Sequence, residues 1–118
     1  MLNHVDVIGR LVRDPEFRRT ESQKAVTTIS LAVDRTMSDD TDFFDVVVWG
    51  KAAENVCKYL TKGRLVAISG HLQSRKWTDK ENKTRYTVEI VADSDGVHFL
   101  PSGKKSDADP GDGEGGEA

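Results

Sequence analysis

Hydrophobic and polar residues alternate most clearly over residues 42–49, which read Asp-Phe-Phe-Asp-Val-Val-Val-Trp. Successive side chains of a β-strand point to opposite faces, so this run predicts a strand with two unlike faces. The purely apolar face, expected to lie in the core, consists of Phe44, Val46 and Val48. The opposite face carries Phe43 and Trp49 beside Asp45, whose carboxylate would be costly to bury unpaired. We therefore expect Phe43 and Trp49 to face solvent or a ligand.

Two earlier stretches also have the pattern of strands. Residues 5–12 are strand-like although their alternation is imperfect, and Pro15, which cannot donate to a ladder, follows shortly after them. Residues 25–33 alternate and carry a strongly apolar face. The polar residues 34–41 predict a loop between this strand and the strand over residues 42–49. Three β elements in a row are therefore predicted.

The hydrophobic period changes after Gly50. Apolar residues now recur at spacings of three and four, which predicts one short amphipathic helix in a stretch that ends at Lys62 and Gly63. These apolar positions are Ala52, Ala53, Val56, Tyr59 and Leu60.

The remaining chain again has the pattern of strands. Residues 65–72 are apolar enough for a buried strand, and residues 85–93 alternate cleanly. The polar residues 79–83 between them predict a hairpin tip, and a short run at residues 97–100 could pair with the sheet.

This element order predicts an all-β OB-fold, a five-stranded Greek-key barrel with one short helix between strands three and four. We expect residues 1–100 to form this domain, since 118 residues suffice for one domain but not for two ordinary ones. Residues 101–118 are acidic, rich in glycine and without large apolar side chains, so we expect a disordered tail. OB-folds bind oligonucleotides and oligosaccharides, which agrees with an exposed aromatic face.

Charge is distributed unevenly along the chain. The formal net charge is −3, and of the 17 basic and 20 acidic residues, 2 and 5 lie in residues 101–118, which leaves 15 of each in the body. Two basic segments on this neutral body could form a groove for a phosphate backbone, or they could be ordinary solvated loop charges. The segments are Arg10, Arg13, Arg18, Arg19 and Lys24, and Arg75, Lys76, Lys80, Lys83 and Arg85.

Three aromatic residues are candidates for contacts with nucleic-acid bases. Phe43 and Trp49 are six positions apart, or roughly 20 Å along a strand, so they would act as separate stations, with Trp77 in the second basic segment as a third. Base stacking on an aromatic side chain contributes about 1 to 3 kcal/mol per base and tolerates any sequence. Alternatively, Trp49 is a core residue at the start of the helix. Phe44, assigned to the core by alternation alone, could instead meet another protomer.

The sequence offers little support for catalysis. Cys57 stands alone on the predicted helix as a packing residue, and the three histidines show no metal-ligand spacing. No glycine-rich phosphate loop precedes the helix, so we predict no enzyme, no metal site and no cofactor. One cysteine, no bilayer-length apolar run and no signal-peptide pattern predict a reduced, cytoplasmic protein without a membrane partner.

A set of short motifs runs in order and with few gaps through residues 1–100. The motifs are Ile8-Gly9-Arg10-Leu11, Asp14-Pro15-Glu16, Ser30-Leu31-Ala32, Val46-Val47-Val48-Trp49-Gly50-Lys51, Ala53-Glu54, Tyr59-Leu60, Lys62-Gly63, Gly70-His71-Leu72, Arg75-Lys76-Trp77-Thr78-Asp79 and Arg85-Tyr86-Thr87-Val88-Glu89. Together they resemble the bacterial single-stranded DNA-binding protein family. The resemblance implies an OB-fold protomer that assembles into a homotetramer. It also implies binding of single-stranded DNA without sequence preference, in replication, repair and recombination, and a nucleoid-associated place in the bacterial cytoplasm.

The resemblance also implies roles for individual residues. Phe43, Trp49 and Trp77 match base-stacking stations of the family, and Lys62 matches a DNA-contacting lysine. Further candidate phosphate contacts are Arg10, Lys51, Arg75, Lys76 and Arg85.

The chain departs from the family pattern in two places. Met37 stands where the family has a further aromatic station, so we expect a weaker or merely apolar contact there. The tail ends with residues 115–118, Gly-Gly-Glu-Ala, instead of an acidic tip with a proline and a terminal phenylalanine. This ending argues against recruitment of partner proteins through the tip. The missing tip keeps open a specialised paralogue for DNA uptake or of plasmid or phage origin. A second alternative is a protein-interaction adaptor of the primosomal type, which would need a stacking face depleted of aromatics, whereas this chain retains three candidates.

Overall fold

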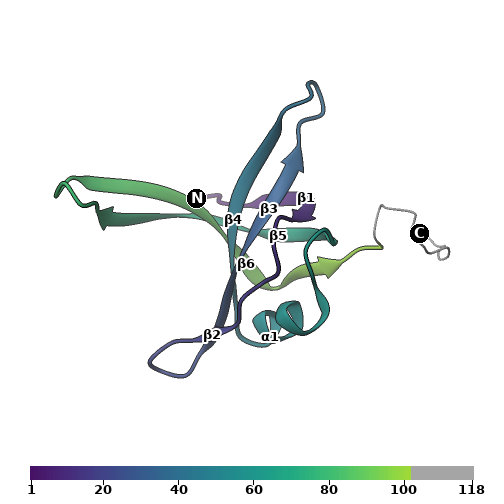
Figure 1. The fold of residues 1–118 in the computed structure, drawn as a ribbon, viewed down its shortest axis with the longest axis horizontal. Helices are drawn as coiled ribbons and strands as arrows, with labels where there is room; N and C mark the ends of the chain where they lie inside the picture. The colour runs from purple at the N-terminus through teal and green to yellow at the C-terminus, as the bar shows by residue number, and fades with distance from the viewer. Residues whose placement is uncertain (102–118) are drawn as a thin grey trace.

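The computed structural model describes residues 1–101, so the tail expected over residues 101–118 lies, apart from its first residue, outside the described residues. The elements in chain order are β1 (Val5–Leu11), β2 (Arg18–Arg19), β3 (Ala25–Asp34), β4 (Thr41–Trp49), α1 (Gly50–Tyr59), β5 (Leu65–Thr78) and β6 (Thr84–Phe99). The strands form one sheet in the order β1-β5-β6-β4-β3-β2, and β1 also pairs with β3, so the sheet closes into a ring (Figure 1). The predicted all-β barrel with one helix before its last two strands is confirmed.

The sheet differs from the prediction in one short strand and in the length of the last two. The two-residue strand β2, which pairs with the start of β3, was not predicted because it is too short to show alternation. Strands β5 and β6 are 14 and 16 residues long, and the run at 97–100 belongs to the end of β6. The pairing of β5 with β6 shifts register between Ile68 and Gly70, where β6 has extra residues.

Two glycines lie where neighbouring strands of the ring approach each other closely. Gly9 of β1 lies so near the carbonyl oxygen of Ala32 in β3 that a Cβ atom at this position would overlap it. Gly70 of β5 lies equally close to the carbonyl oxygen of Val91 in β6. Glycine is required at both crossings because it has no Cβ atom.

The core lies inside the ring, and α1 packs against it mainly through β3. The buried side chains are Leu11, Ala25, Ile29, Leu31, Val46, Val48, Ala53, Val56, Leu60, Val66, Ile68, Ile90 and Ala92. Full burial of each large aliphatic side chain contributes about 1.5 to 3 kcal/mol. Within the described part of the chain, no helix is long and apolar enough to cross a membrane.

Two hairpins extend beyond the ring as arms (Figure 1). The β3–β4 arm consists of the end of β3, the loop 35–40 and the start of β4. The β5–β6 arm consists of residues 73–78, the tip 79–83 and residues 84–89. Both arms are held by their strand ladders and present side chains to solvent on either face.

The position of the β3–β4 arm corrects one prediction. Phe44 is 39% exposed, whereas Val46 and Val48 on the same strand face are fully buried as expected. Phe44 lies opposite Leu31, nearer the start of β4 than Val46 and Val48, and the single chain leaves its side chain partly uncovered. The prediction that Phe44 is a core residue is therefore wrong for the single chain, because alternation identifies a face but not what covers it.

Candidate nucleic-acid interface

The outer face of β3 and β4 carries two of the predicted base-stacking residues. Residues directly opposite each other in an antiparallel pair share a face. The pairs on this face, which we call the aromatic face, are Phe43–Ala32, Asp45–Ser30, Val47–Thr28 and Trp49–Val26. Phe43 is 66% exposed and Trp49 is 44% exposed, so both offer aromatic surface to a ligand, as expected from the alternation.

One predicted phosphate contact lies beside the first of these aromatic residues. Arg10 of β1 is opposite Ala32 of β3, which in turn is opposite Phe43. The Nη1 atom of Arg10 lies 3.6 Å from Oδ2 of Asp34, and both side chains are more than half exposed. Arg10 and Phe43 therefore share one side of the sheet, with the arginine already facing a carboxylate.

Two further arginines border the aromatic face. Arg13 donates a hydrogen bond from Nη1 to Oγ of Ser30 at 2.7 Å, and Arg18 donates one from Nη2 to Oγ1 of Thr28 at 3.4 Å. The sequence placed both arginines in the first basic segment but not among the candidate contacts. The signal that could have found them is the pair of hydroxyl side chains on the outer face of β3, which can accept from guanidinium groups.

The third aromatic candidate lies on the β5–β6 arm. Trp77 is opposite Arg85, and Arg75 is opposite Thr87, so these four side chains share one face of the arm. The indole Nε1 of Trp77 donates a hydrogen bond to Oγ1 of Thr87 at 2.8 Å, and the side chain remains 43% exposed. Lys76 points to the opposite face, so the structure does not bring it together with Trp77.

Carboxylates hold both arginines on this face of the arm. Nε of Arg75 lies 3.4 Å from Oε2 of Glu89, and Nε of Arg85 donates a hydrogen bond to Oδ2 of Asp79 at 2.7 Å. Asp79 also accepts two backbone N–H groups of the hairpin tip at 2.9 and 3.0 Å. The hydrogen bond from Arg85, followed by these backbone bonds, lowers the pKa of Asp79 below its ordinary value. The charged carboxylate thus shapes the tip next to Trp77.

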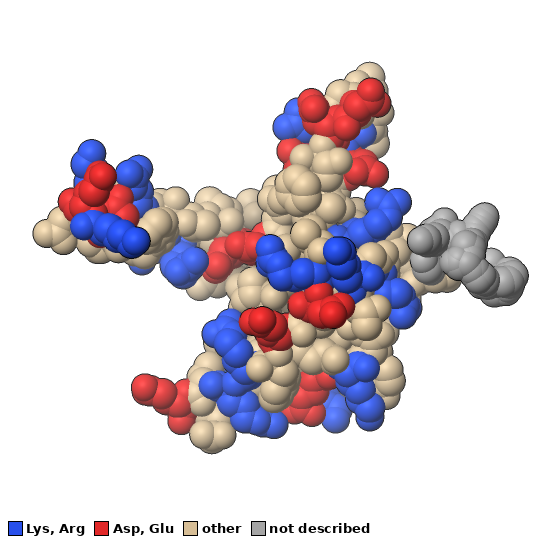
Figure 2. Space-filling model, viewed as in Figure 1, with Lys and Arg blue, Asp and Glu red and all other residues tan. Residues whose placement is uncertain are grey.

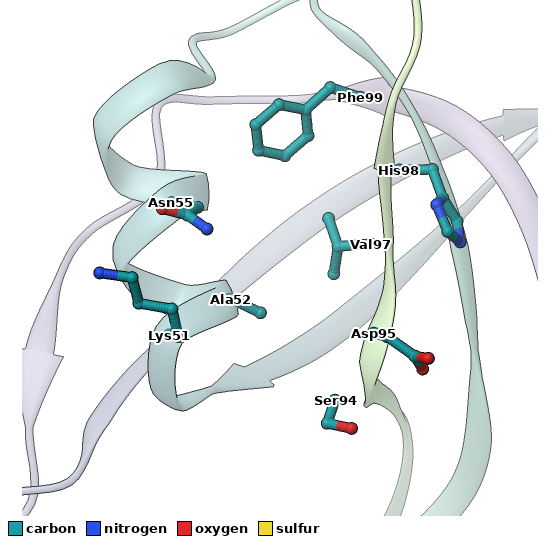
Figure 3. A pocket seen from close by; sticks show the side chains of 8 residues that line it. All are labelled: Lys51, Ala52, Asn55, Ser94, Asp95, Val97, His98 and Phe99. Atoms are coloured by element: carbon teal, nitrogen blue, oxygen red, sulfur yellow. The ribbon is translucent and has the colours of Figure 1, made fainter.

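The two predicted lysine contacts near α1 lie at the start of the helix and just after its end. The backbone N–H of Lys62 donates to Oδ1 of Asp14 at 2.7 Å, which fixes the loop after the helix against the end of β1. Lys51 lies 3.6 Å from Glu54 on α1 and borders a pocket of about 470 Å³ between the helix and the end of β6 (Figure 3). The residues that line this pocket are Lys51, Ala52, Asn55, Ser94, Asp95, Val97, His98 and Phe99.

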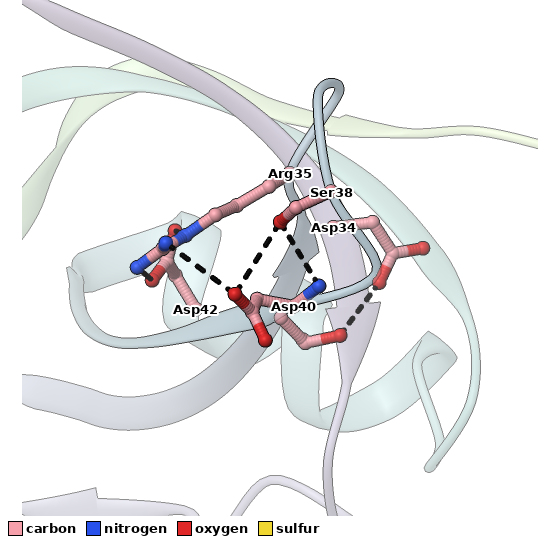
Figure 4. Close-up of polar contacts among 6 residues, drawn as sticks. Asp34, Arg35, Ser38, Asp40 and Asp42 are labelled. Atoms are coloured by element: carbon pink, nitrogen blue, oxygen red, sulfur yellow. Dashed lines mark hydrogen bonds and ion pairs between the residues drawn. The ribbon is translucent and has the colours of Figure 1, made fainter.

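The loop of the β3–β4 arm is organised by one arginine (Figure 4). Nε and Nη2 of Arg35 donate to the two carboxylate oxygens of Asp42 at 3.0 and 2.9 Å, and Nη1 lies 3.7 Å from Asp40. The bidentate hydrogen bond lowers the pKa of Asp42 and raises that of Arg35. Met37, beyond this network, is almost fully exposed. Its thioether offers apolar surface where an aromatic ring was expected from the resemblance.

On the face drawn in Figure 2, positive side chains have negative ones among them. Figure 2 shows Lys and Arg over the centre of the molecule with Asp and Glu among them, and acidic side chains at the tip of the β3–β4 arm. Among residues 1–101, no three His, Cys, Asp or Glu side chains are grouped so that they could hold a metal ion. The site is thus built from aromatic faces and paired cations, which can stack on bases and contact phosphates.

The sequence of the chain is similar to those of known single-stranded DNA-binding proteins. A family model described as "Single-strand binding protein family" matches residues 2–100. The chain is 48% identical over 109 residues to a single-stranded DNA-binding protein from Clostridium tetani, with 88% of this chain and 74% of the relative covered. It is 43% identical over 112 residues to a single-stranded DNA-binding protein from Staphylococcus aureus, with 91% and 70% covered.

Proposed function

The chain belongs to the single-strand binding protein family, and we propose that it binds and protects single-stranded DNA without sequence preference in replication, repair and recombination. The family is one of binding proteins rather than enzymes. The observation that carries the proposal is the exposure of Phe43 and Trp49 on one outer strand face with arginines beside them. Relatives named for single-stranded DNA binding at 43 to 48% identity support the same ligand.

In this proposal bases stack on separate aromatic stations while phosphates meet the neighbouring cations. Phe43 and Trp49 act on the aromatic face and Trp77 acts on the β5–β6 arm. Every base has a π face, so stacking supplies affinity without reading the sequence. The proposed phosphate contacts are Arg10, Lys51, Lys62, Arg75, Lys76 and Arg85. A base in a duplex is stacked on its neighbours and is not available to these rings, which favours single strands.

Titration with an unstructured oligonucleotide tests the function directly. We expect quenching of tryptophan fluorescence, because Trp49 and Trp77 would both stack on bases. If about four phosphates are neutralised per protomer, affinity should fall about fiftyfold between 50 and 200 mM salt. Equal affinity for a duplex of the same sequence, or binding without quenching, would contradict the proposal.

We also propose that the protein is a homotetramer located in the bacterial cytoplasm with the nucleoid. Large apolar side chains that the single chain leaves exposed support self-association. They include Ile8, Phe44, Leu72, Tyr86 and Val88. Sedimentation equilibrium should give four times the protomer mass, and Phe44→Ser should shift the protein toward smaller species if this ring lies between protomers. A wild-type chain that sediments as a monomer would contradict the assembly but not DNA binding.

A further inference from the structure

A carboxylate lies in the middle of the aromatic face. Asp45 follows Phe43 by two residues and precedes Trp49 by four, or about 7 and 13 Å along the strand. All three side chains project to the same face, and Asp45 is exposed. A DNA strand that reaches from one aromatic station to the other therefore passes over this carboxylate.

The orientation of Asp45 is set by a chain of hydrogen bonds. Arg13 donates from Nη1 to Oγ of Ser30 at 2.7 Å, and Ser30 donates from Oγ to Oδ1 of Asp45 at 3.4 Å. Ser30 is also the cross-strand partner of Asp45. The arginine donates to the serine oxygen, so the serine hydrogen is left to point toward the carboxylate. Among residues 1–101, Oδ2 of Asp45 has no hydrogen-bond donor and the residue is exposed, so this oxygen is free to accept a hydrogen bond from a ligand.

An acceptor at this point distinguishes between bases. An ionised carboxylate accepts hydrogen bonds and donates none. Cytosine offers an amino group at N4, adenine offers one at N6, and aspartate is a known partner of the cytosine amino group. Thymine and uracil instead present carbonyl oxygens on either side of their one N–H group, and these oxygens repel the carboxylate. Stacking on Phe43 and Trp49 does not make this distinction.

We propose that Asp45 is a specificity-determining residue that favours bases with an exocyclic amino group over thymine or uracil at the position between the two stations. This inference rests on the proposed function, because it needs a single strand on the aromatic face. It refines that function, since binding remains possible for every sequence but is no longer equal for all of them.

The test compares cytosine and uracil, which differ at this edge by an amino group against a carbonyl oxygen. Affinities for oligo(dC) and oligo(dU) of equal length are measured at about pH 8 for wild type and Asp45→Asn, which keeps the size of the side chain. Asparagine can both donate and accept, so it suits either base. The ratio of the oligo(dU) Kd to the oligo(dC) Kd should be about threefold to tenfold higher in wild type than in the variant, as expected for one exposed hydrogen bond.

A matched control separates this effect from charge alone. Asp39→Asn removes one negative charge from the loop of the β3–β4 arm, and its ratio should equal that of wild type. If Asp45→Asn strengthens binding to both oligonucleotides by the same factor, the carboxylate only repels phosphates and the inference is overturned. Equal changes of the ratio in both variants would overturn it as well. A wild-type protein that binds neither oligonucleotide would instead overturn the proposed function, and the inference with it.

Discussion

Trp77→Ala is expected to weaken binding of single-stranded DNA by about fivefold to 150-fold, because one stacked base contributes about 1 to 3 kcal/mol. Trp77 lies on the β5–β6 arm, outside the core, so its removal should leave the fold intact. The side chain makes one hydrogen bond, from Nε1 to Thr87, and the ladder that forms the arm does not depend on it.

Fluorescence anisotropy of a labelled oligonucleotide measures this loss without relying on the deleted fluorophore. Trp77→Phe is the matched control, since it keeps an aromatic face but loses the N–H donor, and it should retain most of the affinity. Circular dichroism should show the same secondary structure for all three proteins. An aggregated Trp77→Ala protein would indicate that the residue is structural, and an unchanged affinity would remove it from the interface.

Gly70→Ala is expected to reduce the free energy of unfolding by about 3 kcal/mol or more. A Cβ atom at this position would overlap the carbonyl oxygen of Val91 and crowd the Cα atom of Ala92. Both obstacles are backbone of the paired strand β6, so they cannot rotate away as a flexible side chain would. The strands would have to separate beside the register shift, where the ladder is already interrupted.

Urea unfolding followed by circular dichroism measures the effect. Gly63→Ala provides a contrast, because no atom beyond its chain neighbours lies within 4 Å of its added Cβ and its φ of 90° is the source of strain. That strain should cost about 1 to 2 kcal/mol. Equal stabilities for the two variants would show that the contact with β6 relaxes more easily than its geometry implies.

Alternation predicted most of the barrel because its strands each bury one face. The exposure of Phe43 and Trp49 follows from the same pattern, since Asp45 marks their face as unsuitable for burial. Phe44 was assigned wrongly because alternation contains no information about what covers a strand face. The alternation is read from neighbouring residues, whereas the burial of a side chain depends on strands that are distant in the sequence.

The β5–β6 arm was harder to predict for a different reason. Its strands bury little, so the predicted strand ended at residue 72, and no face was assigned to Lys76 or Trp77. The pairing of Arg85 with Asp79 was also not predicted. It depends on a tip in which Asn82 has a φ of 67°, and charge pairs across such a turn follow from its geometry rather than from spacing.

The pairing of the three proposed arginine contacts with carboxylates has a kinetic consequence. Arg10, Arg75 and Arg85 each face an acidic partner before any strand arrives. A phosphate that displaces such a partner exchanges one ion pair for another, so each contact contributes little and can be reversed alone. We therefore expect a bound strand to be released contact by contact, because each arginine can return to its carboxylate partner as soon as its phosphate leaves.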